Sequence, residues 1–419
     1  MANTQNETEI DEKTPQARGK LYQTYVDAEL GLREHWYPAF YSGDLKDGET
    51  RAEMMLGERI YFKRAGGKVY AVEDRCAHRG APFSARPECH SENTISCPIH
   101  GFTYDVRDGK LVNILSLGGD SPLIGKVSVP SYPVEEKFSL IWVYIGDAKP
   151  GPLKADVLPS LWNTPDLVFA PTLRTRIRAN WRIAIENGFD TGHLYLHRNW
   201  DAAKRYNATP PIGAVHKDPD ELILVEEPGS AIGMIVASAT TIMSSEVEGV
   251  RVSSPQVGTD IPAILHENFY PKGFGAFLPC GLDVPAFPLE GNYHWEFYVP
   301  VDEEHHMYFI LNGAQVKNDE EKEAFYERHK TLSRDMWIDP AEVSAEEPEG
   351  FNNADVLGRE AFQHVYQNEN FWHRENLYQA DYAIMKWRYL VARHAGVLQT
   401  RSARQFARPA RNYPEDPIP

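Results

Sequence analysis

The chain has 419 residues, of which 42% are hydrophobic and 11% aromatic, enough for two or three globular domains. The formal net charge of −17 argues against nonspecific nucleic-acid binding and gives no reason to expect an anionic membrane as a partner. No apolar run approaches the length of a membrane-spanning helix, and four cysteines are too few for a disulfide scaffold. The hydrophilic first twenty residues lack the apolar core of a signal peptide, so we expect a cytoplasmic protein.

The first 150 residues predict an arm followed by a small all-β domain. Residues 1–34 are expected to form an N-terminal arm that ends in a short helix over residues 21–32. From residue 35 to residue 150 the apolar pattern is that of β-strands, with Ala65-Gly66-Gly67 and Asp108-Gly109 as turn signals. The strand signals lie at residues 59–64, 68–72, 102–106 and 139–145.

A proline-rich stretch near residue 150 predicts a boundary, after which residues 151–400 are expected to form a larger second domain. Its strand signals, at residues 173–177, 221–225, 233–237, 293–299 and 307–311, predict an antiparallel sheet. Helices are expected over residues 318–336, 355–366 and 375–394. Asn318 and Glu321 form a capping box, His305-His306 predicts a solvated turn, and residues 401–419 predict an irregular tail. The predicted fold class is therefore α+β.

His193 and His197 are four residues apart, a spacing that places both rings on one face of a helix, close enough to share one metal ion. Asp190 precedes them on the same stripe. Two imidazoles and one carboxylate from elsewhere in the chain form the facial triad of a non-haem iron(II) oxygenase, which leaves positions open for dioxygen and substrate. Paired helical histidines are common, and most are structural, so this motif alone is weak.

Two further pairs of metal-binding residues lie upstream, Cys76 with His78 and Cys97 with His100. Two thiolates can hold one iron, and two imidazoles the other iron, of a [2Fe–2S] cluster. The alternative is a Cys2His2 zinc site, although the C-x-H arrangement is unusual for structural zinc. Colour separates the two, because an iron–sulfur protein is brown and a zinc protein is colourless.

These four residues, placed between predicted strands, resemble the Rieske cluster motif. Rieske proteins of respiratory chains carry two further cysteines that brace the cluster, at positions occupied here by Ala81 and Ile99. The stretch from Cys76 to Gly80 instead resembles the oxygenase branch. Cys89 and Cys280 are expected to be ordinary thiols.

With such a cluster, the stretch from Glu186 to His197 resembles the iron site of Rieske non-haem iron ring-hydroxylating oxygenases, in their terminal oxygenase component. The resemblance covers nearly the whole chain and includes Asn180-Trp181-Arg182. Three residues separate the two histidines, whereas many members have four. That spacing is similar to the carbazole dioxygenase and 2-oxoquinoline monooxygenase type, which has one kind of subunit.

The third iron ligand must be a carboxylate downstream, with Asp335, Asp339 and Asp355 as candidates. The resemblance implies Asp355, because in that type the ligand ends a stretch rich in Phe and Asn, as residues 349–355 do here. Phe351 lies four residues earlier and could line the substrate pocket, although a core role fits it equally well.

The resemblance also implies that Asp190 is a bridge, with one oxygen bonded to His193 and the other to a cluster histidine, His100, of a neighbouring subunit. It therefore implies a ring-shaped homotrimer. Electrons would come from NAD(P)H through a reductase, with or without a ferredoxin, since the chain has no glycine-rich dinucleotide motif of its own.

The resulting prediction is an enzyme, a terminal oxygenase that uses dioxygen to hydroxylate or cis-dihydroxylate an apolar aromatic or heteroaromatic compound. The alternatives are a Rieske monooxygenase or dealkylase, a Rieske electron-transfer protein without oxygen chemistry, and a structural zinc module. Mononuclear iron after reconstitution would exclude the electron-transfer protein, and visible absorbance would exclude zinc. Residues 201–241 and the arm have no assigned role.

Overall fold

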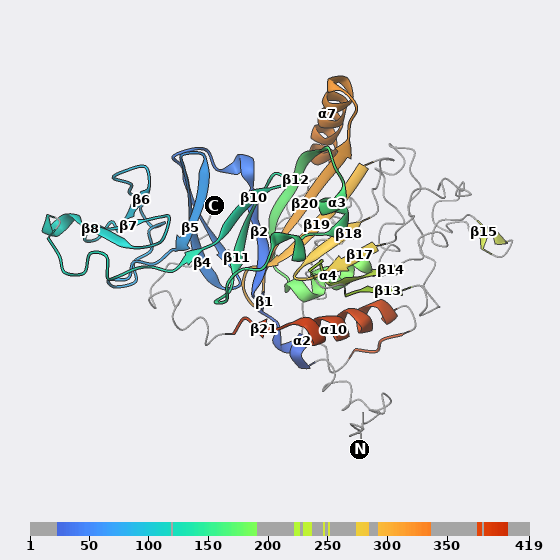
Figure 1. The fold of residues 1–419 in the computed structure, drawn as a ribbon. Helices are drawn as coiled ribbons and strands as arrows, with labels where there is room; N and C mark the ends of the chain where they lie inside the picture. The colour runs from blue at the N-terminus through green and yellow to red at the C-terminus, as the bar shows by residue number, and fades with distance from the viewer. Residues whose placement is uncertain are drawn as a thin grey trace, which may run out of the picture.

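The computed structural model describes residues 23–118, 120–190, 222–226, 229–236, 246–247, 250–251, 274–284, 292–336, 375–378 and 381–400 (Figure 1). Four predicted site residues lie outside these ranges: His193, His197, Phe351 and Asp355. Most of the predicted arm, the predicted helix over residues 355–366 and the predicted tail also lie outside them.

Short antiparallel sheets form the N-terminal part, on the left in Figure 1. Its strands are β1 (Leu32–Arg33), β2 (His35–Tyr41), β3 (Thr50–Met55), β4 (Glu58–Ala65), β5 (Lys68–Glu73), β6 (Thr94–Ser96), β7 (Phe102–Asp105), β8 (Leu111–Ile114), β9 (Ser131–Tyr132), β10 (Val134–Lys137) and β11 (Leu140–Ile145). They pair in the orders β3-β4-β5-β9, β10-β11-β2 and β6-β7-β8. Two 3₁₀ helices, η1 (Ser42–Asp44) and η2 (Leu115–Leu117), lie between them.

The sequence pattern explains these strands. β11 is buried at every position, as expected of a continuous apolar run placed between two other strands. The predicted hairpin of β4 and β5 is confirmed, with Gly66 and Gly67 at positive φ in its turn. The predicted turn before β8 needs Gly109, because a Cβ atom there would lie 2.0 Å from the carbonyl oxygen of Val129.

A seven-stranded antiparallel sheet forms the second part, in the order β12-β20-β19-β18-β17-β14-β13. Its strands are β12 (Leu167–Ile177), β13 (Leu222–Val225), β14 (Gly233–Val236), β17 (Phe274–Phe277), β18 (Gly281–Val284), β19 (Asn292–Pro300) and β20 (His306–Gln315). A separate pair is β15 (Glu246–Val247) with β16 (Val250–Arg251). The five predicted strands are confirmed, and β12 and β20 extend further because they pair with each other along most of their length.

Few helices flank this sheet: α2 (Gln23–Asp27), α3 (Pro159–Asn163), α4 (Trp181–Phe189), α7 (Asp319–Met336), α10 (Tyr382–His394) and the 3₁₀ helix η3 (Leu153–Ala155). The α+β prediction is therefore confirmed. In the capping box of α7, Asn318 Oδ1 accepts a hydrogen bond of 2.8 Å from the Glu321 amide. None of the described helices is long and apolar enough to cross a membrane.

Two helix predictions were too long. The helix predicted over residues 21–32 ends at Asp27, because Gly31 takes a φ of +93° and the chain turns into β1. The helix predicted from residue 375 begins at Tyr382. Before it, the Asp381 carboxylate accepts a hydrogen bond of 2.8 Å from the Tyr378 amide and closes a turn.

The prediction of a solvated turn was wrong for His306, whose side chain is fully buried. His306 opens β20 and pairs with Ile177 on one side and Pro300 on the other, so neighbouring strands cover it. Its Nδ1 lies 2.7 Å from the carbonyl oxygen of Ala179, just before α4.

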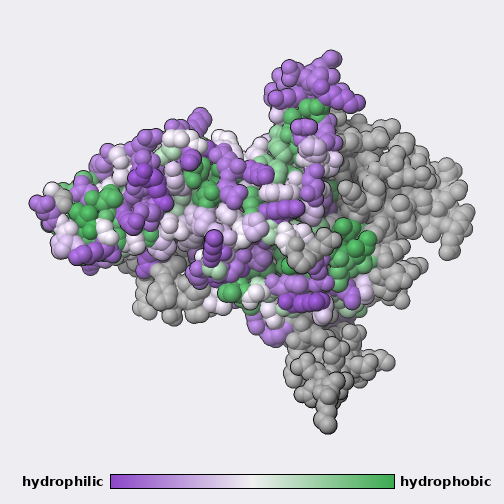
Figure 2. Space-filling view, viewed as in Figure 1, coloured by the Kyte–Doolittle hydropathy of each residue, from purple (hydrophilic) through white to green (hydrophobic). Residues whose placement is uncertain are grey.

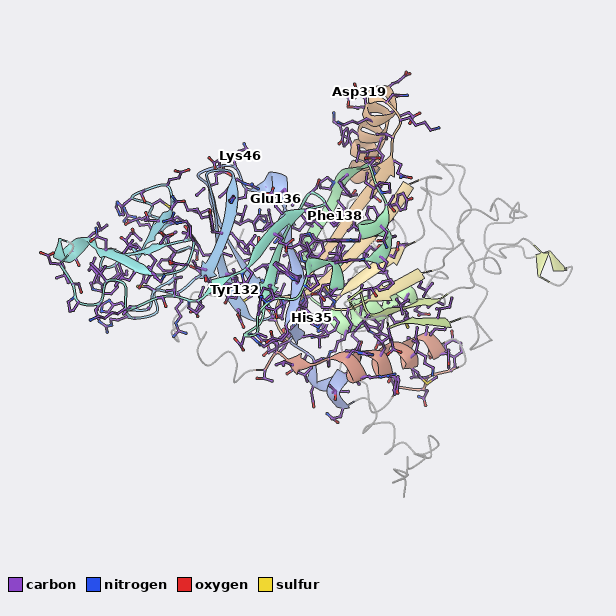
Figure 3. All side chains as sticks on the ribbon, viewed as in Figure 1. His35, Lys46, Tyr132, Glu136, Phe138 and Asp319 are labelled. Carbon is purple, nitrogen blue, oxygen red and sulfur yellow. The ribbon has the colours of Figure 1, made fainter. Side chains whose placement is uncertain are left out.

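One hydrophobic core spans both parts of the described chain. Phe138, labelled in Figure 3, lies in the turn between β10 and β11. Its ring packs edge-to-face on Trp162 of α3 at a ring distance of 5.7 Å. Nδ1 of His35, also labelled in Figure 3, lies 2.6 Å from the carboxylate of Asp156, which follows η3. The two parts therefore have a fixed relative position.

The start and the end of the described chain are also paired. β1 pairs with β21 (Val397–Leu398), so that Leu32 lies opposite Leu398 and Arg33 lies opposite Val397. The side-chain amide of Gln399 donates hydrogen bonds to the Leu56 carbonyl at 2.9 Å and to the Glu58 carboxylate at 2.8 Å. Residues near position 398 thus complete the N-terminal part.

Glu73, at the end of β5, predicts a pH-dependent stability. Burial, with the nearby carboxylates of Glu58 and Asp74, raises the pKa of Glu73 from 4.5 to about 7. The unfolded chain releases this proton near pH 4.5 and the folded chain near pH 7, so the free energy of unfolding falls as pH rises through this window. We expect Glu73→Gln to raise the free energy of unfolding by on the order of 2 kcal/mol at about pH 8, because glutamine carries no charge to bury. The gain should vanish toward about pH 5. Denaturation at several pH values tests this, and an equal gain at every pH would contradict it.

Candidate active site: a cluster site and a helix that leads to an iron site

Two loops, one after β5 and one after β6, have the same hydrogen-bonding pattern. The Gly80 amide donates to the Cys76 carbonyl at 2.8 Å, and the Gly101 amide donates to the Cys97 carbonyl at 2.9 Å. In each loop the cysteine amide also donates to the carbonyl five residues further on, at 2.8 Å. Both glycines have positive φ, a conformation that glycine adopts without strain. The two loops therefore share one backbone hydrogen-bonding pattern, and each presents one cysteine and one histidine.

The four predicted cluster residues come together as two pairs. Cys76 and Cys97 are buried, and a hydrogen bond between their sulfurs lowers the pKa of Cys97 and raises that of Cys76. His78 and His100 are exposed at the loop tips, with ring centroids 4.8 Å apart. Two sulfur donors beneath two nitrogen donors match a [2Fe–2S] cluster held at one iron by thiolates and at the other by imidazoles.

Sequence reasoning missed two residues that support this site. The Ala77 amide donates to the Tyr104 hydroxyl at 3.2 Å, and that hydroxyl lies 3.3 Å from the Cys76 sulfur. Burial raises the pKa of Tyr104, so it remains a proton donor. The ring of Phe102 stacks on His78 at 4.6 Å. The alternation of Phe102 and Tyr104 in β7 was visible in the sequence, but it predicted only a strand.

We expect Tyr104→Phe to lower the reduction potential of the cluster by roughly 50 mV. A hydrogen bond to a ligand sulfur stabilises the reduced cluster, which carries more negative charge. The expected shift corresponds to a fraction of the free energy of a hydrogen bond to a charged group. Redox titration followed by visible absorbance measures the shift. Tyr61→Phe, in the same hydrophobic cluster, is the control. An unchanged potential in Tyr104→Phe with intact cluster content would contradict the assignment.

α4 leads directly to the predicted histidine pair. Asn180 is its N-cap and accepts a hydrogen bond of 3.2 Å from the Arg182 amide. At Gly188 an added Cβ atom would lie 2.5 Å from the Tyr298 hydroxyl and 2.6 Å from Leu282. The last turn of α4 therefore lies directly on β18 and β19, and any side chain at this position would force Tyr298 and Leu282 to shift.

Asp190 is the C-cap of α4, and its amide donates to the carbonyls of Glu186 and Asn187 at 3.1 and 3.2 Å. Its backbone is extended, so the prediction that it lies within the helical stripe was wrong. Gly188 in the last turn and Gly192 just beyond have low helix propensity, which explains an end here.

The half-buried Asp190 acts electrostatically on two residues of the segment before α10. Burial and then the negative charge of Asp190 raise the pKa of Tyr378. The pKa of Asp381 is raised by burial first, with Asp190 again contributing. Tyr378 is 59% exposed, and Asp190 itself is partly exposed.

Exposed apolar side chains gather near the cluster loops. They are Ile99, Val112, Leu115, Leu117 and Leu123, and we call them the apolar tip. Ile99 precedes His100, and the Leu115 amide donates to the Gly101 carbonyl at 2.9 Å. Figure 2 shows this hydrophobic area at the left end of the molecule, over β8. A gathered apolar surface of this kind marks an interaction site.

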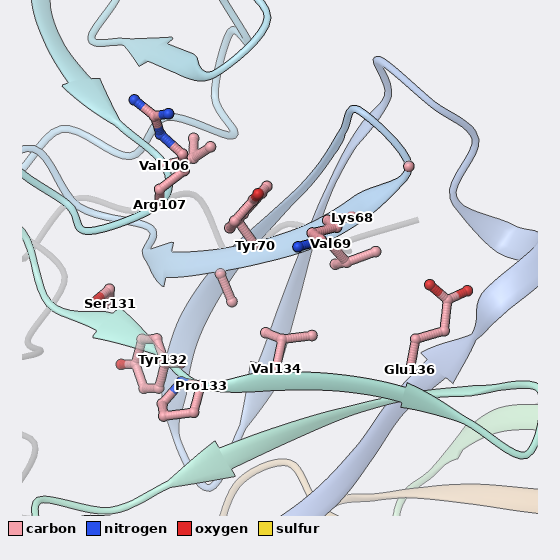
Figure 4. A pocket seen from close by; sticks show the side chains of 12 residues that line it. Lys68, Val69, Tyr70, Val106, Arg107, Ser131, Tyr132, Pro133, Val134 and Glu136 are labelled. Atoms are coloured by element: carbon pink, nitrogen blue, oxygen red, sulfur yellow. The ribbon is translucent and has the colours of Figure 1, made fainter.

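A groove of about 470 Å³ lies elsewhere in the N-terminal part, between β5 and the β9–β10 segment (Figure 4). Its lining includes Tyr70, Arg107, Tyr132 and Glu136. None of its lining residues comes from α4 or the seven-stranded sheet, so it is not the substrate pocket of the predicted iron site.

Comparisons with known proteins cover both parts. Residues 35–133 match the Rieske [2Fe-2S] domain family, and residues 144–399 match the family described as homotrimeric ring hydroxylase. The chain is 35% identical to the terminal oxygenase component CarAa of carbazole 1,9a-dioxygenase from a Sphingomonas species, over 92% of this chain and 97% of the relative. It is 32% identical to CarAa from Metapseudomonas resinovorans, over 92% and 96%. The solved reduced complex between oxygenase and ferredoxin in carbazole 1,9a-dioxygenase matches with a TM-score of 0.77 and 31% identity, over 94% of this chain and 97% of that chain.

Proposed function

Because this chain belongs to the homotrimeric ring hydroxylase family and carries a Rieske domain, we propose that it hydroxylates an apolar, bicyclic or tricyclic aromatic or heteroaromatic compound. It is an oxygenase component and an enzyme. The observation that carries the proposal is the pair of equivalent loops that presents two cysteines beneath two histidines, in a chain that also holds the α4 motif.

Two metal groups belong to this family, a Rieske [2Fe–2S] cluster and a mononuclear non-haem iron. When bound, they store single electrons and activate dioxygen. Cys76, His78, Cys97 and His100 are the proposed cluster ligands. His193, His197 and Asp355 are the proposed iron ligands, and their two imidazoles and one carboxylate suit iron(II). Phe351 remains a proposed pocket residue.

Asp190 is proposed to carry the connection between the two metal sites across a subunit interface. As a carboxylate it accepts two hydrogen bonds, which fixes the tautomer and the orientation of each histidine it contacts. The exposed His100 and the apolar tip form one end of this contact, and Asp190 with the exposed Tyr378 the other. Two different surfaces that meet head to tail form a closed ring when the rotation between subunits closes, as it does in a homotrimer.

The overall reaction consumes one substrate molecule, one O2, two electrons and two protons. Dihydroxylation gives a cis-dihydrodiol, whereas monooxygenation or dealkylation gives one oxidised product and water. The relatives are named carbazole 1,9a-dioxygenases, and one solved relative is bound to ferredoxin, so we favour dihydroxylation and a ferredoxin as the direct electron donor. An NAD(P)H-dependent reductase would supply the ferredoxin.

Product analysis under labelled dioxygen tests the proposal, with the holoenzyme, an NAD(P)H-dependent reductase, a ferredoxin and a panel of two- and three-ring aromatics. Two labelled atoms in one product support dihydroxylation. One labelled atom with labelled water supports monooxygenation. A protein that cycles its cluster and never incorporates oxygen would be an electron-transfer protein, which would overturn the proposal.

We further propose a boundary near residue 150 between the cluster domain (residues 35–150) and the iron domain (residues 151–400). The predicted arm and short helix (residues 1–34) would precede them, and the irregular tail (residues 401–419) would follow. We also propose the cytoplasm as the location. No disulfide joins any two of Cys76, Cys89, Cys97 and Cys280, as a reducing compartment favours.

A further inference from the structure

The two loops that present the proposed cluster ligands are closed at their bases in different ways. The loop around Cys97 is the turn of a hairpin, in which Ser96 of β6 pairs with Thr103 of β7 and their hydroxyl oxygens lie 2.7 Å apart. The loop around Cys76 has no such base, because residues 74–93, all of which the structure describes, contain no strand. Strand pairing therefore holds the second loop but not the first.

Asp74, directly after β5, closes the first loop instead. One oxygen of its carboxylate accepts a hydrogen bond of 2.9 Å from the Ser84 amide, and the other accepts a hydrogen bond from the Ser84 hydroxyl. Both hydrogen bonds reach across residues 75–83, so they fix the start of the loop against its end. We call residues 74–84 the first ligand loop.

Arg59 of β4 completes this contact. Its Nη2 donates to the Ser84 hydroxyl at 3.2 Å, and its Nε lies 3.4 Å from the Asp74 carboxylate. The Asp74 side chain is fully buried, and a buried carboxylate is costly unless it is hydrogen-bonded and paired, as it is here. An apolar side chain could fill the same space, but it could not hold both the amide and the hydroxyl of Ser84.

The contact between Asp74 and Ser84 reaches the cluster site from two sides. Asp74 precedes Cys76 by two residues in the chain. Phe83, the residue before Ser84, is buried, and its ring packs edge-to-face on Tyr104 at 5.5 Å. The Tyr104 hydroxyl lies 3.3 Å from the Cys76 sulfur. A shift of either end of the first ligand loop would therefore be felt at Cys76.

We propose that Asp74 is a positioning residue whose carboxylate, through Ser84, holds the first pair of cluster ligands opposite the second pair. The inference rests on the proposed cluster ligands. The rings of His78 and His100 are only 4.8 Å apart, so a small rotation of the first ligand loop changes how the two imidazoles face one iron. Asp74 binds no iron in this assignment and acts through Ser84.

The test uses the full chain with its cluster and follows two signals. They are the loss of visible absorbance in the presence of an iron chelator and the electron paramagnetic resonance spectrum of the reduced cluster. We expect Asp74→Ala to lose the cluster about 10- to 100-fold faster than the wild type, the range seen when a partner outside the metal shell is lost. Its spectrum should broaden, because the two imidazoles take several relative arrangements.

Asp74→Asn shows whether the contacts or the charge of Asp74 matter. The asparagine oxygen still accepts a hydrogen bond from the Ser84 amide, and its NH2 group can donate to the Ser84 hydroxyl. The rate of cluster loss should therefore return to within about threefold of the wild-type rate. A rate equal to that of Asp74→Ala would mean that the negative charge matters, and the positioning role would be wrong.

Ser84→Ala shows whether Asp74 acts through Ser84. This variant removes the hydroxyl and keeps the amide, so cluster loss should be about three- to tenfold faster than in the wild type, the equivalent of one hydrogen bond. The variant with both alanines should lose the cluster no faster than Asp74→Ala alone, and effects that multiply would contradict the proposal. Ser84→Ala keeps the proposal testable if Asp74→Ala does not fold. Wild-type cluster retention and spectrum in every folded alanine variant would overturn it.

Glu53 of β3 provides a matched control. It is also a buried carboxylate that is ion-paired, with Arg51 at 2.5 Å and with Arg174 at 2.6 Å, and neither arginine belongs to a ligand loop. Glu53→Ala should lower the melting temperature to a similar extent and leave cluster loss and spectrum unchanged. Equal cluster loss in Glu53→Ala and Asp74→Ala would show a general loss of stability and would also overturn the proposal.

Cys76→Ser separates this proposal from the ligand assignment. If Cys76→Ser keeps a full cluster, the proposed ligand set is wrong. If it loses the cluster whereas Asp74→Ala retains it as the wild type does, the ligand set stands and the role of Asp74 is wrong.

Discussion

Replacing Asp190 by asparagine is expected to reduce turnover by about 10²- to 10⁴-fold while both metal sites remain loaded. The amide has nearly the shape of the carboxylate, and the cap of α4 depends on the backbone amide of Asp190, which the variant keeps. However, an amide has only one acceptor oxygen and presents an NH2 group to the other histidine. It therefore disrupts one of the two hydrogen bonds on which the proposed bridge depends.

Iron content, cluster absorbance and single-turnover oxidation of the reduced cluster are the measurements. Reduction of the cluster should be normal in Asp190→Asn, and its oxidation in the presence of substrate and dioxygen should be slow. Asp381→Asn is the matched control, because Asp381 is a nearby carboxylate whose hydrogen bond from the Tyr378 amide an asparagine can still accept. Normal turnover in Asp190→Asn would show that the bridge assignment is wrong.

Replacing Cys97 by serine is expected to remove the cluster and its brown colour. NAD(P)H-driven turnover should fall by at least about a hundredfold, which is more than the loss of a residue hydrogen-bonded to a metal ligand causes. The sulfur of Cys97 is buried beside that of Cys76, and a serine hydroxyl is a poor ligand for the iron of such a cluster. Mononuclear iron should remain, since its proposed ligands belong to the second domain.

Cys89→Ser is the control for this experiment, because Cys89 is exposed in the loop between the two ligand pairs. Its cluster absorbance and turnover should equal those of the wild type. A full cluster in Cys97→Ser, or its loss in Cys89→Ser, would require a different ligand set.

Features that depend on residues close together in the sequence, such as the ligand loops and the strands, could be predicted from sequence patterns. The spacing of Cys76, His78, Cys97 and His100 defines a pair of ligand loops, and the alternation of apolar residues defines the strands that support them. The frame of each loop was also in the sequence, as a glycine four residues after each cysteine, but its meaning becomes clear only when the two hydrogen-bonding patterns are compared.

Long-range contacts were not predictable in the same way. The periodicity of residues 186–197 favours one continuous helix, but tertiary packing of Gly188 on β18 and β19 and a cap at Asp190 end α4 earlier. Arg388, a buried residue of α10, forms ion pairs with Glu186 and Glu375, and nothing near it in the sequence indicates these partners. The burial of His306 likewise depends on strands from two other regions of the chain.

The pairing of β1 with β21 has a consequence for biosynthesis. The N-terminal part cannot complete its contacts until residues 397–399 have left the ribosome, because Leu32 and Leu56 bond to them. Contacts of such large sequence separation form late and slowly. During translation the ligand loops therefore emerge long before the contacts between β1 and β21 can form.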